Sequence, residues 1–306
     1  MTEPIQVAAE VADTLASGGP VVALESTIFS NLGLPSPHNA DALARCVTAI
    51  RAAGAVPAIT AVLDGVARVG LDPDEHDRIL GEGRKVGERE VALAIVQRWA
   101  FGATTVSASL LLAARTGIVV FSTGGIGGVH RDASATGDIS ADLGAIATHP
   151  VVTVCAGAKA FLDLARTLEH LETLGVPVLG YRTDAFPAFT VRSSGLPVTA
   201  RVESVTEAAA VVWAERALGR LGGVVLAVPI PADAALTESD VDDATRDALA
   251  GAKAEGLSGP AITPYVLARL AATTDGRTIA PNLTLAEHNA AVAGALAVEL
   301  AARGVS

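Results

Sequence analysis

Apolar runs and amphipathic segments alternate along the whole chain. Short runs rich in Val, Ile and Leu are typical of buried strands, and longer segments with apolar residues every three or four positions are typical of helices. The predicted strands cover residues 20–27, 55–65, 66–70, 118–125, 151–157, 176–181, 196–202 and 222–230, and those at 55–65 and 66–70 are expected to form a strand pair or hairpin. The predicted helices cover residues 5–18, 36–54, 103–117, 138–150, 160–175, 204–219, 242–256, 260–276 and 283–304. In the helix 36–54, Ser36 is expected to act as the N-cap and Pro37 as the first helical residue.

Strands that are followed by covering helices predict an α/β fold, with α/β/α layers around a mostly parallel central sheet. No segment rich in Pro, Ser or charge interrupts the alternation, so residues 1–306 are predicted to form a single domain. Half of the residues are hydrophobic and 18% are charged, which is typical of a globular protein.

Net charge and segment lengths limit the partners and the location. The net charge of −11 argues against nucleic-acid binding, because phosphate recognition favours a basic face. The N-terminus lacks the basic start and apolar core of a signal peptide, and no apolar run reaches membrane length. We therefore expect a cytoplasmic protein without a membrane partner.

The loops that follow the predicted strands carry the candidate chemistry, as ligand sites in parallel sheets do. The loop with Gly124, Gly125, Gly127 and Gly128 does not fit the dinucleotide fingerprint, since His130 stands where glycine is needed. Two interpretations stay open for this loop. It is either a tight turn that needs positive φ, or a segment whose backbone amides approach a ligand.

Lys159 and Glu25 are the clearest candidates for catalysis. Lys159 is one of only three lysines among 22 basic residues, and arginine cannot supply a neutral amine for attack on a carbonyl carbon. The structural alternative is an ion pair with Asp163. Glu25 directly follows a buried strand, where burial would raise its pKa and suit it to proton transfer, or where it would only bind neighbouring amides.

Acidic and basic residues elsewhere have structural alternatives of their own. Asp138 and Asp142 are four residues apart, so both carboxylates could lie on one helix face and approach one cation such as Mg²⁺ or Mn²⁺. Capping of the helix by Asp138 or Ser140 is the competing interpretation. Lys85 lies in a strongly charged run and would by default be a solvated surface residue.

An ordered series of motifs resembles the pseudouridine-5′-phosphate glycosidase family over roughly residues 5–300. The motifs are ALESTIFSNLGLPSPHN, AITAVLDGVARVGL, FGATTVSAS, FSTGGIGGVHR, DISADL, AGAKAFLDLARTLEHLETLGVPVLGYRTDAFPAF, AVPIP and EGLSGPAITPYVLARL. The resemblance implies an α/β/α enzyme, usually a homotrimer with a divalent metal, typically Mn²⁺. Such enzymes reversibly cleave the C–C glycosidic bond of pseudouridine 5′-phosphate to give uracil and ribose 5-phosphate.

The same resemblance implies roles for individual residues of this chain. Glu25 matches the family's proton donor, Lys159 its nucleophile and Asp138 its metal-binding aspartate. Positions that match substrate-contacting residues are Lys85 for the sugar phosphate, Val106, and the segment Ser140, Ala141 and Asp142. The residues that match the base side of the pocket are Thr123, His130 and Asn289.

Departures from the family pattern cluster where the aglycone is expected. Asn31-Leu32-Gly33 replaces a usual His-Gly step, and Gly137 stands where a bulky Phe or Met is usual, which predicts a wider pocket beside Gly137. Some relatives in antibiotic-producing bacteria are C-glycosynthases that join ribose 5-phosphate to an aromatic carbon. The alternatives to uracil release are therefore a C-glycosynthase for a larger aromatic ring and, further off, a non-catalytic sugar-phosphate-binding protein.

Overall fold

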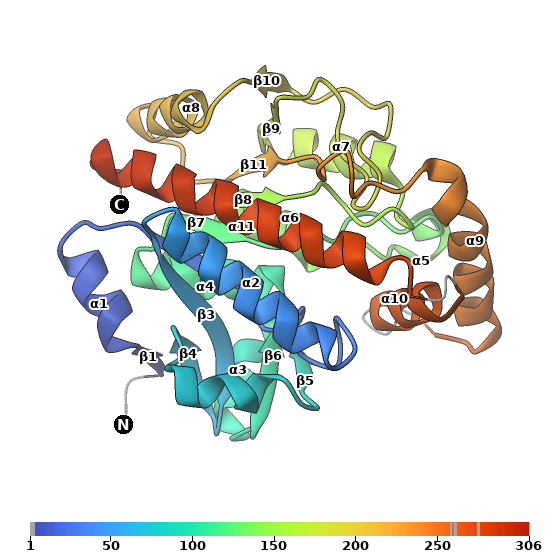
Figure 1. The fold of residues 1–306 in the computed structure, drawn as a ribbon, viewed down its shortest axis with the longest axis horizontal. Coiled ribbons are helices and arrows are strands. Elements are labelled where there is room, and N and C mark those ends of the chain that lie inside the picture. Colours follow the sequence, from blue (N-terminus) through green and yellow to red (C-terminus); the bar gives the residue numbers. More distant parts are fainter. Residues whose placement is uncertain (1–3, 258, 260–261, 274–275, 306) are drawn as a thin grey trace.

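A central β-sheet organises the chain in the computed structural model, which describes residues 4–257, 259, 262–273 and 276–305 (Figure 1). The strand order is β1-β4-β3-β2-β7-β8-β11-β9-β10, with β6 pairing β3 and β5 pairing β6. The strands are β1 Ile5–Val7, β2 Val21–Leu24, β3 Val56–Leu63, β4 Val66–Val69, β5 Arg84–Val86, β6 Phe101–Thr104, β7 Val120–Ser122, β8 Val152–Cys155, β9 Val178–Tyr181, β10 Ala200–Val202 and β11 Val224–Ala227.

Helices cover both faces of this sheet, which confirms the predicted α/β/α layers. The α-helices are α1 Ala9–Ala16, α2 His38–Ala52, α3 Val91–Val96, α4 Val106–Thr116, α5 Ala133–Thr136, α6 Ala141–Thr148, α7 Leu164–Thr173, α8 Val205–Ala217, α9 Glu238–Ala254, α10 Ile262–Thr273 and α11 Ile279–Ala302. One apolar core lies between the sheet and α2, α8 and α11, and the other lies between the sheet and α1, α3, α4, α6 and α7.

Parallel pairing places the ends of the central strands side by side. β2 pairs β7 and β7 pairs β8, both in parallel, so that Leu24, Ser122 and Val154 lie in register. All residues of β2, β7 and β8 are buried, as expected for strands covered on both faces. The loops that leave these three strands therefore meet at one edge of the sheet.

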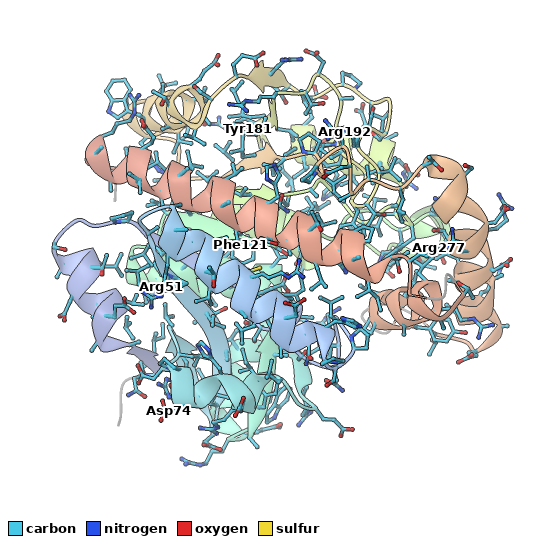
Figure 2. The ribbon with its side chains drawn as sticks, in the orientation of Figure 1. Arg51, Asp74, Phe121, Tyr181, Arg192 and Arg277 are labelled. Carbon is cyan, nitrogen blue, oxygen red and sulfur yellow. The ribbon has the colours of Figure 1, made fainter. Side chains whose placement is uncertain are left out.

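The long helix α11 crosses one face of the sheet beside α2, although the two helices come from opposite ends of the chain (Figure 1). Helices α9 and α10 pack against each other at one end of the molecule. Phe121 of β7 is fully buried at the centre of the view, whereas Asp74 and Arg277 lie at its edges (Figure 2).

Several element boundaries differ from the sequence prediction. Residues 5–18 begin with the strand β1, because Ile5 and Val7 alternate with Gln6 and pair with β4 before the helix starts. The helix predicted from residue 103 begins only at Val106, and β6 precedes it. Pro37 takes the N-cap position of α2 rather than the first helical position, and no side-chain cap bond is present there.

One further prediction is confirmed, and another concerns a segment that the structure describes only in part. The hairpin around Asp64-Gly65 is confirmed by antiparallel pairing of β3 with β4. The predicted helix 260–276 corresponds to α10, and its residues 260–261 and 274–275 lie outside the described part of the chain. Across the described residues, we find no helix with the length and apolar character that crossing a bilayer requires.

Candidate active site

Glu25 is a buried carboxyl at the end of β2. Glu25 is 8% exposed, and the Thr123 hydroxyl donates a hydrogen bond to its Oε1 atom. Burial raises the pKa of Glu25, while the positive charge of Lys159 and the bond from Thr123 oppose that rise only in part. A carboxyl with a raised pKa holds its proton closer to neutral pH, which suits a proton donor.

Buried hydroxyl groups fix the backbone directly after Glu25. The Ser26 amide donates to Thr104 Oγ1 at 3.3 Å, and the Thr104 amide donates to Ser26 Oγ at 3.0 Å. The Thr27 hydroxyl donates to the Thr104 carbonyl at 2.7 Å. These reciprocal bonds tie the loop after β2 to β6, so Glu25 is held by the sheet.

The glycine loop after β7 is shaped by close neighbours. None of Gly124, Gly125, Gly127 and Gly128 has a positive φ, so the first of the two open interpretations, a tight turn that needs positive φ, is wrong. A Cβ atom on Gly125 would lie 2.7 Å from the Phe189 ring, and one on Gly127 or Gly128 would lie still closer to the side chain of Ser140 or Thr167. Gly124 has more room, since the nearest side chain would be 3.3 Å away. Glycine is needed here because other side chains approach the backbone closely.

Lys159 projects from the loop after β8 toward this glycine loop. Its Nζ atom donates a hydrogen bond to the Gly125 carbonyl at 3.0 Å. Asp163 instead caps α7 by accepting the Arg166 amide at 3.0 Å, which speaks against the structural alternative of an ion pair with Lys159. The amine of Lys159 is therefore held by a neutral carbonyl beside the acid Glu25.

Lys85 lies on β5 and is partly buried, which corrects its default interpretation as a solvated surface residue. Burial lowers the pKa of Lys85 and the charge of Lys159 lowers it further, while Asp142 and Glu25 act in the opposite direction. The charges of Lys85, Lys159, Glu25 and Asp142 thus act on one another within one site.

Asp142 joins two elements through backbone amides. Its carboxylate accepts the Ser107 amide of α4 at 3.2 Å and the Gly127 amide at 2.9 Å. Ser140 caps α6 by accepting the Asp142 amide at 3.3 Å, as the capping interpretation predicted. Val106, the first residue of α4, is 2% exposed, and Ala141 is the first residue of α6.

Asp138 precedes α6, so it does not share a helix face with Asp142 as the spacing suggested. Its Oδ2 atom lies 3.8 Å from His130 Nδ1, and its side chain is 21% exposed. Within the described residues, no group of three or more His, Cys, Asp or Glu side chains gathers around a point where a metal could bind. Asp138 can offer one carboxylate to a cation that keeps water and substrate oxygens, as Mg²⁺ and Mn²⁺ often do.

Asn289 is placed differently from the base-side position that was expected. It is 1% exposed, and its Nδ2 atom donates to the carbonyls of Thr123 at 2.8 Å and Gly124 at 3.2 Å. The amide of Asn289 therefore holds backbone and does not line the cavity beside Lys159.

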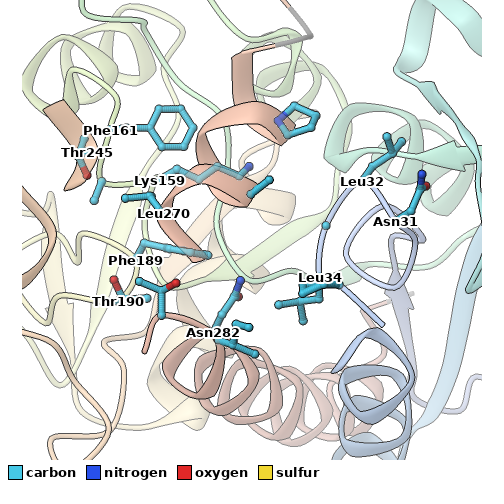
Figure 3. Close-up of a pocket in the computed structure, with 17 residues that line it drawn as sticks. Asn31, Leu32, Leu34, Lys159, Phe161, Phe189, Thr190, Thr245, Leu270 and Asn282 are labelled. Atoms are coloured by element: carbon cyan, nitrogen blue, oxygen red, sulfur yellow. The ribbon is translucent and has the colours of Figure 1, made fainter. Parts of the chain in front are cut away.

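A mostly apolar cavity of about 220 Å³ adjoins Lys159 (Figure 3). Its walls come from the loop after β2, the segments around Lys159 and Phe189, and helices α9 to α11. The lining residues are Asn31, Leu32, Gly33, Leu34, Pro35, Lys159, Ala160, Phe161, Phe189, Thr190, Thr245, Pro264, Ala268, Leu270, Thr278, Ile279 and Asn282.

The residues that line the cavity include one that the sequence did not indicate and exclude one that it did. Asn282, which the sequence analysis missed, lines the cavity from α11, and its spacing of seven from Asn289 was the signal available. Gly137 is exposed, ends α5 with a φ of 70° and does not line this cavity, so the pocket widened at Gly137 stays a prediction. Asn31 and Leu32 do line it.

Known proteins are similar to this chain over nearly its whole length. A family described as "Indigoidine synthase A like protein" matches residues 10–299. The pseudouridine-5′-phosphate glycosidase of Methylobacterium nodulans is 47% identical, with 97% of this chain and 88% of that protein covered. The protein of the same name from Chloroflexus aurantiacus is also 47% identical, with coverage of 98% and 100%.

Solved structures extend the comparison to the fold. The prealnumycin C-glycosynthase AlnA, in complex with ribulose 5-phosphate, is similar with a TM-score of 0.89, 37% identity and 99% of each chain covered. An indigoidine synthase A-like protein from Thermotoga maritima is similar with a TM-score of 0.87, 32% identity and coverage of 97% and 96%. This chain therefore belongs to the indigoidine synthase A-like family and is related over nearly its full length to pseudouridine-5′-phosphate glycosidases.

Proposed function

We propose that this protein is an enzyme that reversibly cleaves pseudouridine 5′-phosphate with water, giving uracil and ribose 5-phosphate through an imine at Lys159. One observation carries the proposal. An amine and an acid with a raised pKa are hydrogen-bonded to the same loop. The Lys159 amine donates to the Gly125 carbonyl, and the Thr123 hydroxyl donates to the Glu25 carboxyl. The names of relatives that cover 97% and 98% of this chain support the same substrate.

The chemistry requires these two groups because a carbon leaving group has no lone pair to protonate. Glu25 gives its proton to the ribose ring oxygen, and the C1′–O4′ bond opens. The Lys159 Nζ atom bonds to C1′ and loses a proton, and its restored lone pair then expels the base as the C1′–C5 bond breaks and C5 of uracil takes up one proton. Water hydrolyses the resulting imine to ribose 5-phosphate and restores the amine.

The sugar phosphate is proposed to bind toward Lys85, whose partly buried cation stands beside the charges of Lys159 and Asp142. Val106 and the segment 140–142 are proposed to complete that side at the starts of α4 and α6, where backbone amides favour anions. Thr123 and His130 do not line the cavity beside Lys159, so we propose that they contact only the edge of the base that stays outside it. The base itself would occupy the cavity on the far side of Lys159.

A divalent cation, Mn²⁺ by resemblance to the family, is proposed to bind with the Asp138 carboxylate as its protein ligand. Such a cation would neutralise negative charge on the substrate. Replacing Asp138 by Ala should abolish Mn²⁺ binding, measured by titration of the free ion's electron paramagnetic resonance signal. Asp132→Ala, an exposed neighbour, is the matched control. Unchanged Mn²⁺ affinity in Asp138→Ala would remove this proposal.

Borohydride trapping tests the central step. The chain has only three lysines, so reduction in the presence of ribose 5-phosphate should place the sugar phosphate on the peptide of Lys159 and spare Lys85 and Lys253. Lys159→Ala should abolish both the adduct and turnover, whereas Lys253→Ala, at an exposed site on α9, should keep both. Turnover that persists in Lys159→Ala would contradict the imine mechanism.

A second candidate function is favoured by the walls of the cavity. Leu32, Leu34, Phe161, Phe189 and Ile279 make an apolar surface that also suits a fused aromatic ring. The similar structure of the C-glycosynthase AlnA supports this alternative, in which the same imine chemistry joins ribose 5-phosphate to a larger aromatic carbon nucleophile. Condensation assays with uracil and with fused-ring phenols discriminate between the two.

The assembly and location are proposals from the family resemblance. We propose a cytoplasmic homotrimer whose small-molecule partners are a phosphosugar and a nucleobase or aromatic aglycone. The mass in solution, compared with the chain mass of 30.7 kDa, checks the assembly.

A further inference from the structure

The segment 123–125 is bonded to both groups that carry the proposed reaction. At its first residue, the Thr123 hydroxyl donates to the Glu25 carboxyl. At its last residue, the Gly125 carbonyl accepts the Lys159 amine at 3.0 Å. The relative position of acid and amine therefore depends on where this segment lies.

The segment has little of its own to hold it in place. β7 ends at Ser122, and both Gly124 and Gly125 lack side chains that could anchor the loop. The Thr123 amide donates to the Val154 carbonyl at 3.0 Å, and the Ala156 amide donates to the Gly124 carbonyl at 2.9 Å. These bonds fix one side of the segment to β8 and its loop.

Asn289 fixes the other side from α11. Its single amide nitrogen spans two consecutive carbonyls, those of Thr123 at 2.8 Å and Gly124 at 3.2 Å. Together with the bond from Lys159, three successive carbonyls of the segment are engaged by side chains. α11 is a 24-residue helix packed on β7, α2 and α8, so it offers a rigid base for this contact.

The buried amide of Asn289 lowers the stability of the folded protein in a way that an apolar side chain would not. Its Oδ1 atom is buried, and among the described residues it has no hydrogen-bond partner. A buried acceptor without a partner destabilises the folded state. The amide is therefore better explained by what its nitrogen holds than by packing alone.

We propose that Asn289 is a positioning residue that holds segment 123–125 so that the Glu25 carboxyl and the Lys159 amine reach one sugar at the same time. This inference rests on the proposed function. It moves Asn289 from a base contact to a backbone clamp. Reactions that need two aligned groups lose on the order of a hundredfold in rate for displacements near 1 Å, so a clamp on both groups affects turnover strongly.

Asn39 provides a matched control because it has the same bonding pattern elsewhere. It is 2% exposed, and its Nδ2 atom donates to the carbonyls of Phe29 at 3.1 Å and Leu80 at 2.9 Å. Asn289→Leu and Asn39→Leu each remove a buried amide that bridges two carbonyls. Only the first removes a contact to the segment that bears Thr123 and Gly125.

The experiment measures thermal unfolding, kcat, KM and the pH profile for both variants and for wild type. Both variants should unfold at lower temperature. Asn289→Leu should lower kcat on the order of ten- to hundredfold with KM for the sugar phosphate changed less than about threefold. Asn39→Leu should keep a wild-type pH profile.

The pH profile separates positioning from general destabilisation. The hydrogen bond from Thr123 holds the pKa of Glu25 down, so a displaced Thr123 lets that pKa rise. Because the donor acts when protonated, the alkaline limb of kcat should move to higher pH in Asn289→Leu.

Wild-type kcat and pH profile in folded Asn289→Leu would overturn the clamp, while wild-type borohydride trapping at Lys159 would leave the proposed function standing. If Asn289→Leu does not fold, Asn289→Ser, which keeps one donor, gives the same comparison. It should retain more activity than Asn289→Ala, and equal activity in the two would also overturn the clamp.

Discussion

At the scale of single residues, the proposed reaction depends on two ionisable groups in unlike surroundings. Glu25 is enclosed at the end of a strand, where burial outweighs the nearby cation of Lys159 and raises its pKa. Lys159 stands at the wall of a cavity and is bonded to a neutral carbonyl, so its amine is open to an incoming carbon. An acid and an amine kept apart by the segment 123–125 can act on different atoms of one sugar.

Replacing Glu25 by Gln tests the raised pKa through stability. A carboxyl with a raised folded-state pKa contributes stability below its unfolded pKa of about 4.3, and that contribution is lost as the pH rises through the folded value. The melting temperature of Glu25→Gln relative to wild type should therefore increase with pH from about 4 upward, on the order of a few °C, and then level off. Calorimetry across pH measures this difference.

The exposed Glu82 supplies the control for that measurement. Glu82→Gln should show a flat difference from wild type over the same pH range. A melting-temperature difference that falls with pH in Glu25→Gln would mean that the carboxylate is stabilised in the folded state, contrary to the burial argument.

At the scale of elements, hydrophobic periodicity predicted the strand–helix alternation because buried parallel strands are continuous apolar runs. β2, β8 and β11 were readily found for that reason. β5 was missed because Arg84 and Lys85 make it charged, and only pairing with β6 makes it a strand. β1 was absorbed into a predicted helix, since three residues give too short a pattern.

The loops at the strand ends were predictable for the same reason as the strands themselves. Glu25, the glycine loop and Lys159 follow three strands that are neighbours in the sheet, so parallel pairing brings them together. The cavity walls were not predictable in this way. Residues 31–35 and 278–282 meet only through packing of α11 over the sheet.

The two asparagines of α11 show what the sequence pattern alone cannot predict. Asn282 and Asn289 are seven residues apart, which places both on one side of the helix. Periodicity does not say which of them faces a cavity and which faces backbone. That depends on the tilt of α11 relative to β7, so the contact to Thr123 and Gly124 emerged only with the structure.

At the scale of the whole molecule, the cavity beside Lys159 is built from both ends of the chain. The loop after β2 supplies Asn31 and Leu32, while α10 and α11 supply Leu270, Ile279 and Asn282. The groups assigned to the sugar phosphate, including Lys85 and Asp142, do not line it. Under the proposed assignment, sugar chemistry and aglycone selection are therefore separate, with Lys159 between the two.

This separation predicts that filling the cavity changes the aglycone and spares the sugar. Leu32→Trp adds a ring to the cavity wall, and apolar pockets discriminate by about 1–3 kcal/mol for each methylene-sized change. Condensation of ribose 5-phosphate with a fused-ring phenol should fall at least tenfold more than condensation with uracil. Borohydride trapping of ribose 5-phosphate on Lys159 should stay at the wild-type rate, and Leu218→Trp, at a residue 77% exposed, should change none of these rates. Equal losses with both rings, together with slower trapping in Leu32→Trp, would place the sugar itself in this cavity and reverse the assignment of its two sides.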